Sequence, residues 1–273
     1  MTGERRVLTG MPPMVAGSAL LQTAALGGLA ADWQAWPWML AAVAANHAAL
    51  TAACVLPRSH LLGPNITRLP DRARDRGEVA LTFDDGPDAA GTPKVLRILD
   101  RDGATASFFC VGSRAARDPG LVREIVAHGH DVENHTFQHQ NVFAFRRSRG
   151  LTSEIGRAQD LLTELSGRAP VFFRAPMGIR GPWLQSVLTR FDLSLVSWTR
   201  RGYDGLPADP GQVLARLTRG LGAGDIIVLH DGGPRGGHVA VQTLPRLLGA
   251  IADRGLKAVS LTRAFAPETA NAV

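Results

Sequence analysis

The sequence has 273 residues, a length that suits one large α/β domain with an additional segment. Its 45% hydrophobic and 20% charged residues exclude a disordered chain. The net charge of +6 comes almost wholly from arginine, and no basic tract is interleaved with aromatic residues, so we expect no nucleic-acid partner, and nothing implies a protein partner.

The N-terminal fifth is almost free of charge, since only Asp32 interrupts an uncharged stretch from residue 7 to residue 57. Within it, Met14–Ala31 and Trp38–Leu56 are close to the roughly 20 residues that cross a bilayer. Tryptophans, which favour the membrane interface, cluster between the two segments at positions Trp33, Trp36 and Trp38. We therefore expect residues 1–57 to form a helical hairpin that associates with a membrane through transmembrane helices.

Two other interpretations of this stretch stay open. Both segments are rich in alanine, and Asn46 and His47 lie in the middle of the second, where polar groups oppose insertion. A soluble hairpin packed on the domain is therefore one alternative, and a cleaved signal peptide that ends near Ala30 and Ala31 is another. The side of the membrane also stays open, although arginines flank both ends and favour the cytoplasm for both.

Residues 58–75 contain several prolines and a run of Arg and Asp, which predicts an exposed linker. From 76 to 265, short apolar runs alternate with amphipathic stretches of helical length, the pattern of a parallel sheet. Seven runs have strand character: Val79–Phe83, Thr105–Val111, His130–Asn134, Val171–Arg174, Leu193–Trp198, Asp225–His230 and Lys257–Leu261. They predict an α/β fold, a distorted, incomplete (β/α)₇ barrel, which a tail at 266–273 follows.

Polar side chains gather where these strands end, which is where such barrels carry their active sites. Asp84 and Asp85 follow the first strand, and two adjacent aspartates there need a cation. His135 and His139, spaced HxxxH after the third strand, reach one ion if the segment turns helically. With one carboxylate they form a set that zinc and related divalent metals accept, with positions left open for water. The pattern predicts a hydrolytic metal site.

Five motifs occur in one order along the chain: Thr82–Pro87, His135–His139, Arg174–Gly178, Val196–Asp204 and Val228–His230. Over residues 76–262 they resemble the polysaccharide deacetylases of carbohydrate esterase family 4, with their chitooligosaccharide deacetylase (NodB) homology domain. The resemblance implies that the domain at 76–265 is a polysaccharide deacetylase-like catalytic barrel.

The resemblance also implies roles for single residues. The metal ligands are Asp85, His135 and His139, and they hold one divalent ion, zinc in the first instance, with cobalt or another divalent metal as alternatives. Asp84 is the general base, and Arg174 holds it in place. His230 is the general acid, and Asp204 orients it.

Substrate contacts are implied for Met177, Trp198 and Val228. The motifs depart from the family pattern at four positions, and one of these changes, Val228 in place of leucine, is conservative. Met177 stands where the family usually has an aromatic residue, so less surface is available for stacking on a sugar. Arg201 replaces the usual first aspartate of the fourth motif, and Gly205 replaces the usual tryptophan after Asp204.

The chemistry of the residues and the resemblance agree on a metal-dependent hydrolase that removes an N-acyl group, in the first instance acetyl, from an amino sugar of a polysaccharide or glycan. One alternative is a deacylase of a lipid-linked amino sugar, which suits the N-terminal segments. Another is a non-catalytic glycan-binding barrel, which only the departures from the fourth motif, Arg201 and Gly205, favour. The expected partners are therefore an N-acylated amino-sugar polymer or lipid-linked glycan and a membrane.

Overall fold

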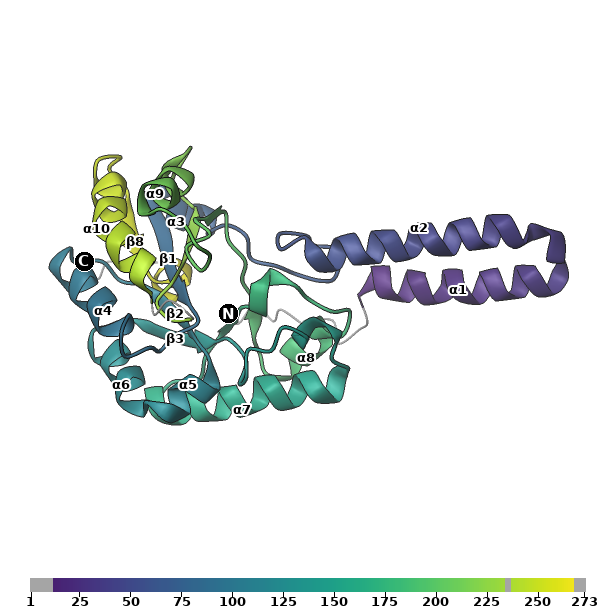
Figure 1. Cartoon of the computed structure of the whole chain (residues 1–273), viewed down its shortest axis with the longest axis horizontal. Coiled ribbons are helices and arrows are strands. Elements are labelled where there is room, and N and C mark those ends of the chain that lie inside the picture. The colour runs from purple at the N-terminus through teal and green to yellow at the C-terminus, as the bar shows by residue number, and fades with distance from the viewer. Residues whose placement is uncertain (1–11, 234–236, 268–273) are drawn as a thin grey trace.

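The computed structural model describes residues 12–233 and 237–267, and it shows a helical hairpin joined to an α/β barrel (Figure 1). The hairpin consists of helix α1 (Pro13–Ala31) and helix α2 (Trp36–Val55), with a short 3₁₀ helix, η1 (Trp33–Ala35), between them. Both expected N-terminal helices are therefore present.

The hairpin projects from the barrel, and little of it is buried. The apolar windows of its two helices have mean hydropathies of 1.4 and 1.5, and only 11% and 6% of their residues are buried within the chain. The polar groups in the middle of the hairpin satisfy one another: Asn46 Nδ2 donates to Ser18 Oγ at 2.7 Å, and Gln22 donates to the same oxygen at 3.2 Å. Pairing of this kind lowers the cost of placing polar groups in an apolar environment.

Parallel strands form the barrel in the order β5-β4-β3-β2-β1-β7-β6, and β8 pairs with β1. The seven expected strands are all present, which confirms the distorted, incomplete barrel. The strands are β1 (Glu78–Asp84), β2 (Ser107–Cys110), β3 (Asp131–Asn134), β4 (Phe172–Phe173), β5 (Ser194–Leu195), β6 (Arg200–Arg201), β7 (Ile226–His230) and β8 (Lys257–Val259).

The stretch predicted as one strand from Leu193 to Trp198 is strand only at Ser194–Leu195 in the structure, and a further strand that was not predicted follows it at Arg200–Arg201. The first, β5, pairs with β4, and the chain then crosses to the other end of the sheet, where β6 pairs with β7. The two arginines of β6 have no apolar pattern, so the sequence does not indicate this strand. Because β5 and β6 are the two ends of the strand order, the barrel is incomplete.

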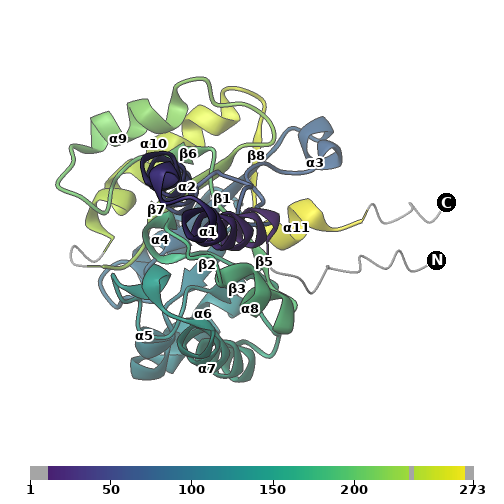
Figure 2. The same ribbon diagram turned by 90° about the vertical axis from the view of Figure 1, so that its right-hand side faces the viewer.

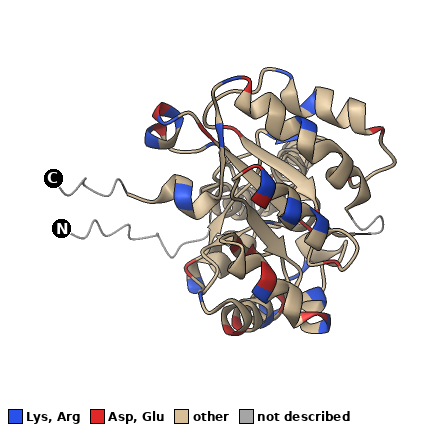
Figure 3. Ribbon diagram, turned by 90° about the vertical axis from the view of Figure 1, so that its left-hand side faces the viewer, with Lys and Arg blue, Asp and Glu red and all other residues tan. Residues whose placement is uncertain are grey.

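Helices cover the outside of the sheet, with α9 and α10 on one side and α5, α6 and α7 on the other (Figure 2). On the face shown in Figure 3, basic and acidic residues are interspersed. The helices of the barrel are α3 (Asp71–Asp75), α4 (Thr92–Arg101), α5 (Gly112–Arg117), α6 (Pro119–Ala127), α7 (Ser148–Ser166), α8 (Leu184–Arg190), α9 (Pro210–Thr218), α10 (His238–Ala252) and α11 (Leu261–Phe265), with 3₁₀ helices η2 (Phe143–Phe145) and η3 (Pro176–Gly178).

The connector at 58–75 is packed on the barrel, so the expectation of an exposed linker is wrong. Leu62 and Leu69 are each 3% exposed, and Ala73 of α3 is fully buried. Ile66 forms a parallel bridge with Val196, just after β5. The Arg, Asp and Pro residues that suggested a linker lie mainly on the exposed side of this connector. The apolar residues between them cover the end of the sheet where the barrel is incomplete.

The C-terminal end of α2 is attached to the loop that follows η3. The backbone N–H of Arg180 donates to the carbonyl of Cys54 at 3.1 Å, and Ser197 Oγ donates to the carbonyl of Pro57 at 2.6 Å. Asn65 Nδ2 donates to the same Pro57 oxygen at 2.8 Å. These bonds fix the base of the hairpin against one wall of the barrel.

Candidate active site

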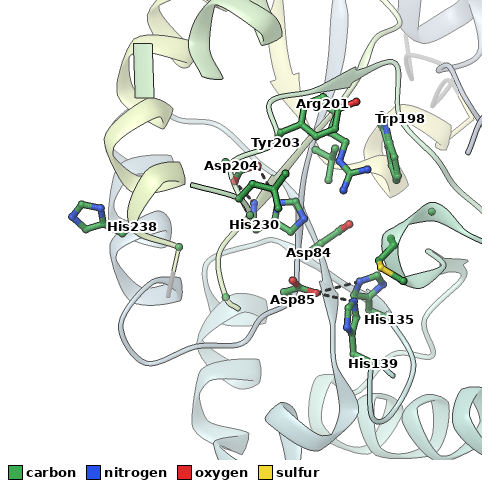
Figure 4. A pocket seen from close by; sticks show the side chains of 17 residues that line it. Asp84, Asp85, His135, His139, Trp198, Arg201, Tyr203, Asp204, His230 and His238 are labelled. Atoms are coloured by element: carbon green, nitrogen blue, oxygen red, sulfur yellow. Dashed lines mark hydrogen bonds and ion pairs between the residues drawn. The ribbon is translucent and has the colours of Figure 1, made fainter. Parts of the chain in front are cut away.

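A pocket lies at the carboxyl ends of the strands, where the sequence motifs converge (Figure 4). The parallel register explains the convergence: Thr82 and Asp84 of β1 stand beside Val228 and His230 of β7. Its lining includes every candidate site residue except the fully buried Arg174: Asp84, Asp85, His135, His139, Met177, Trp198, Asp204, Val228 and His230.

Asp85, His135 and His139 form a compact cluster of possible metal ligands. One ligand atom from each lies within 4.8 Å of the others. The distance from Asp85 Oδ1 to His139 Nε2 is 3.1 Å, and that to His135 Nε2 is 3.5 Å (Figure 4). The structure thus brings together the three residues that the sequence analysis expects as metal ligands.

The cluster fits a divalent cation. His135 Nδ1 lies 2.8 Å from the carbonyl oxygen of Arg174, which can only accept, so Nδ1 carries a proton and Nε2 is the ring nitrogen that faces Asp85. Burial above all lowers the pKa of His139 to about 4, so that ring is neutral at neutral pH. Asp85 Oδ1 is buried and accepts no hydrogen bond within the described residues. Acceptors that face one another in this way need a cation between them.

The backbone around the cluster is unusual, because several residues with side chains have positive φ. Asp85 has φ of 69°, Thr136 of 65° and His139 of 51°, and Met177, on the opposite wall of the pocket, has 57°. The His135–His139 segment is therefore a loop rather than the helical turn that the HxxxH spacing suggested. Left-handed conformations in residues other than glycine cost energy and cluster at functional sites, where they direct side chains.

Asp84 is held by the arginine that the resemblance assigned to it. Arg174 is fully buried, and its Nη1 lies 2.6 Å from Asp84 Oδ1 and 2.8 Å from Thr82 Oγ1. Its Nη2 donates to the carbonyl of Ser197 at 3.2 Å, and its guanidinium carbon lies 4.1 Å from the centre of the Phe109 ring. Burial lowers the pKa of Arg174, and Asp84 opposes that effect, as expected of a paired charge in a dry site.

His230 is oriented by Asp204. Its Nδ1 lies 3.0 Å from Asp204 Oδ1, and its backbone N–H donates to Oδ2 of the same carboxylate at 2.8 Å. Burial alone would lower the pKa of His230, but the hydrogen bond and the negative charge of Asp204 raise it to about 9. The ring is therefore protonated at neutral pH. Because Nδ1 is bonded to Asp204, Nε2 is the nitrogen that can donate to a ligand in the pocket.

The remaining wall is built from apolar and aromatic side chains. Trp198 is 7% exposed and Val228 1%, whereas Met177 is 42% exposed. Sequence reasoning missed Tyr203 and Leu206, which also line this wall, although Tyr203 lies inside the fourth motif and is the only tyrosine in the chain. His238 borders the pocket as well, but its ring points away from it (Figure 4).

Comparisons with known proteins identify the family. Residues 71–196 match the family model for polysaccharide deacetylase. A peptidoglycan-N-acetylglucosamine deacetylase of Bacillus cereus is 30% identical over 196 residues, which cover 70% of this chain and 69% of that protein. The chain belongs to the polysaccharide deacetylase family.

Further relatives of this polysaccharide deacetylase have matching folds and related activities. A chitooligosaccharide deacetylase of Sinorhizobium fredii is 36% identical over 194 residues, which cover 65% of this chain and 86% of that protein. The crystal structure of a family 4 carbohydrate esterase from Streptomyces lividans, in complex with acetate, superposes with a TM-score of 0.62 at 32% identity and covers 67% of this chain and 91% of that one. The family depends on a divalent metal, in agreement with the cluster of Asp85, His135 and His139.

The departures from the family pattern change the pocket of this deacetylase in two ways. A Cβ atom at Gly205 would lie 3.7 Å from the His230 ring, so the glycine leaves open a space beside His230 that a tryptophan would fill. Arg201 adds a guanidinium to the wall formed by Trp198 and Tyr203.

Adding zinc to the metal-free deacetylase is expected to raise its melting temperature. A ligand at about 100 times its Kd stabilises the folded state by about 2.7 kcal/mol. His139→Ala should lose most of this gain, because it removes one of the three ligands. Thermal unfolding over a series of zinc concentrations measures the effect, and His128→Ala, at a partly exposed histidine that pairs with Asp100, serves as the control. A full gain in the His139 variant would contradict the assignment of the metal site.

The pH dependence of kcat/KM should have an alkaline limit near pH 9, where His230 loses its proton. The folded state raises this pKa from 6.5 to about 9, so the same group stabilises the fold fully below pH 6.5 and loses that contribution as the pH rises through 9. Asp204→Asn should move the alkaline limit toward pH 7, because it removes the charge that stabilises the imidazolium. A pH profile with the same limit in both proteins would show that His230 is not the acid.

Proposed function

We propose that this polysaccharide deacetylase is a metal-dependent hydrolase that removes the N-acetyl group from an N-acetylglucosamine-type sugar. The observation that carries the proposal is the presence, in one pocket, of a carboxylate held by a buried arginine, a protonated histidine held by an aspartate, and a His₂Asp cluster. Together they supply a base, an acid and a metal site, which are the three components that amide hydrolysis needs.

The metal ligands of the proposed mechanism are Asp85, His135 and His139. A zinc ion bound to them would polarise the acyl carbonyl and lower the pKa of a water molecule. Zinc is proposed because two neutral imidazoles and one carboxylate form a donor set that it accepts and leave positions open for substrate and water. Asp85 suits this role, since its Oδ1 is buried and lies 3.1 Å from His139 Nε2 and 3.5 Å from His135 Nε2.

The chain's own groups then transfer the protons. Asp84 accepts a proton from the attacking water, and Arg174 holds the carboxylate by Oδ1 while this happens. His230 donates the Nε2 proton to the departing amine, which lets the C–N bond break and leaves acetate and a free amino sugar. Asp204 keeps the ring in place through Nδ1 and stabilises its positive charge until the proton is given up.

The opposite wall positions the substrate. The backbone N–H of Met177 is assigned to the acyl oxygen, where negative charge develops during attack. Val228 is assigned to the pocket for the acetyl methyl group and Trp198 to the wall behind it. The relatives named for peptidoglycan and chitooligosaccharide deacetylation support an N-acetylglucosamine unit as the substrate. Acetate release from N-acetylglucosamine oligomers by the zinc-loaded protein tests the proposal, and no release from any N-acetylated sugar would refute it.

The proposed division of the chain assigns membrane attachment to residues 1–57 and catalysis to residues 76–265. The two hairpin helices support attachment because they are apolar, long enough to span a bilayer and largely exposed. Leu26 and Leu40 are 70% and 60% exposed, and Trp33 and Trp38, near the turn, are 73% and 76% exposed. Exposed apolar surface of this extent needs a bilayer or another protein to cover it.

We expect the full chain to sediment with membranes and to require detergent for extraction. The double variant Leu26→Glu/Leu40→Glu should move much of the protein to the soluble fraction, because two charges in the hairpin oppose insertion by about 2.5 to 3.5 kcal/mol each. As a control, Leu206→Glu changes a 59% exposed leucine on the barrel and should leave fractionation unchanged. A wild-type chain that stays in solution at low salt without detergent would refute attachment.

A further inference from the structure

Arg201 places a positive charge in the active-site pocket that the proposed mechanism does not use. It is the second residue of the two-residue strand β6, and neighbouring side chains of a strand point to opposite faces. Arg200 points away from the pocket, with its Nε 2.7 Å from Asp225 Oδ2. Arg201 points into the pocket, above Asp84 and beside Trp198 (Figure 4).

Aromatic rings rather than carboxylates hold the Arg201 guanidinium. Its central carbon lies 4.9 Å from the centre of the Trp198 ring and 4.9 Å from that of the Tyr203 ring. Among the described residues, no carboxylate lies within 4.0 Å of it, and its Nε is buried without a hydrogen-bond partner. The two rings therefore flank the guanidinium without using its N–H donors, which suits it to bind a ligand.

The acidic groups of the pocket are already occupied. Arg174 pairs with Asp84, His230 pairs with Asp204, and the third carboxylate, that of Asp85, belongs to the metal cluster. Arg201 is therefore an additional cation among groups whose charges are matched. A neutral sugar polymer gains little from such a charge, whereas an anion gains a charge-assisted, two-point contact with the guanidinium.

We propose that Arg201 binds a phosphate group of the substrate, so that the substrate is an N-acylated amino sugar with a phosphate ester beside the acylated amine. The inference rests on the proposed deacetylase function and specifies its substrate class. In a 2-acylamino sugar the anomeric carbon is next to the carbon that carries the nitrogen. A phosphate there can therefore reach the pocket wall while the acyl group lies at the metal cluster. The planar fork of arginine matches the oxygens of phosphate.

The same wall meets the base of the hairpin. Gly178 packs between Trp198 and Pro57 so closely that a Cβ atom there would lie 2.5 Å from the Trp198 ring and 3.0 Å from the Cβ atom of Pro57. Pro57 lies two residues after the end of α2, so the hairpin ends close to Trp198, the ring against which Arg201 lies. The phosphate can thus come from a soluble sugar phosphate or from a lipid carrier that links the sugar to the bilayer.

The first test measures binding without turnover. Zinc-loaded full-length protein with Asp84→Asn is titrated calorimetrically with N-acetylglucosamine 1-phosphate, with its uncharged methyl glycoside and with N-acetylmuramic acid. We expect the phosphate to bind at least about tenfold more tightly than the glycoside, and Arg201→Gln to abolish the difference. Arg216→Gln is the matched control, since Arg216 lies 6.0 Å from the same Tyr203 ring without lining the pocket, and it should keep the difference.

Three results of this titration would overturn the inference. Equal affinities for the sugar phosphate and the methyl glycoside would show that the negative charge of the phosphate contributes nothing to binding. A preference for phosphate that survives Arg201→Gln but is lost with His139→Ala would place the phosphate on the metal. If Arg201 increased the affinity for N-acetylmuramic acid more than that for the sugar phosphate, the site would be one for a carboxylate.

Measurements of turnover then distinguish a soluble sugar phosphate from a lipid-linked one. They also test the phosphate site at Arg201 separately from the deacetylase function. Wild-type protein is given N-acetylglucosamine 1-phosphate, a polyprenyl diphosphate N-acetylglucosamine in detergent micelles, and a neutral N-acetylglucosamine oligomer. Faster acetate release from the lipid-linked sugar assigns a lipid carrier, and equal release from both phosphates assigns a soluble one. Release that is unaffected by Arg201→Gln would refute the inference alone. Arg201-dependent binding with no acetate release from any substrate would refute the deacetylase function alone.

Discussion

Asp84→Asn should reduce the rate of deacetylation by about 10²-fold or more while zinc and substrate affinity remain close to those of the wild type. The substitution keeps the shape of the side chain and an oxygen for Arg174 Nη1, but it removes the basicity that accepts the water proton. A hundredfold loss corresponds to about 2.7 kcal/mol of transition-state stabilisation. Single-turnover rates at saturating substrate measure it, with zinc content determined on the same samples.

The same variant distinguishes an enzyme from a glycan-binding barrel. A binding module could keep the cluster of Asp85, His135 and His139 as a structural metal site, but it has no use for a carboxylate that accepts a proton. Asp88→Asn is the matched control, because Asp88 lies in the loop after β1 and bonds to backbone N–H groups outside the pocket. Unchanged turnover in Asp84→Asn would exclude Asp84 as the base, and a parallel loss of zinc would place it among the metal ligands.

Much of this site could be predicted from the sequence, because the chemistry is carried by residues at the ends of apolar runs. In a parallel sheet these ends share one edge, so Asp84, His135 and His230 must meet once the runs are recognised as strands. The need for a cation beside Asp84 also follows from a simple argument, since a buried carboxylate beside a second one needs one, and the family resemblance singles out Arg174. The structure gives this pair a distance of 2.6 Å.

The features that could not be predicted depend on contacts between distant parts of the chain. Strand β6 exists because β7 offers it a partner, and its two arginines have no strand pattern of their own. The connector is packed because the barrel is incomplete between β5 and β6, which its Arg and Asp residues do not indicate. The use of Arg201 follows only from the rings of Trp198 and Tyr203 around it.

Local backbone conformation was the other source of error. The HxxxH spacing suggested a helical turn, but Thr136 and His139 have left-handed conformations, and the two imidazoles reach Asp85 from a loop. The three expected ligands lie together although the backbone geometry assumed for them was wrong. Ligand identity is constrained by the chemistry of the ion, whereas several backbone paths can bring the same side chains together.

Arg174→Met should lower both stability and turnover, and it should affect metal affinity much less. The substitution leaves the Asp84 carboxylate buried without its partner, and breaking a buried ion pair from one side costs about 3 to 5 kcal/mol. Turnover should fall by about 10²-fold, because the base is no longer held in its productive position. The metal site should survive, since His135 bonds to the backbone carbonyl of residue 174, which the substitution keeps.

A double-mutant cycle separates the ion pair from the packing of the arginine. Asp84→Asn combined with Arg174→Met leaves neither charge of this pair buried alone, so it should recover part of the unfolding free energy that Arg174→Met loses. Arg180→Met is a control at another buried arginine, 2% exposed, which contacts the hairpin base and not Asp84; it should lower stability without lowering kcat. If Arg174→Met lost zinc and turnover in equal measure, Arg174 would support the metal ligands rather than the base. Asp84 is the last residue of β1 and Asp85 follows it directly, so only the ratio of these two losses shows which aspartate the arginine serves.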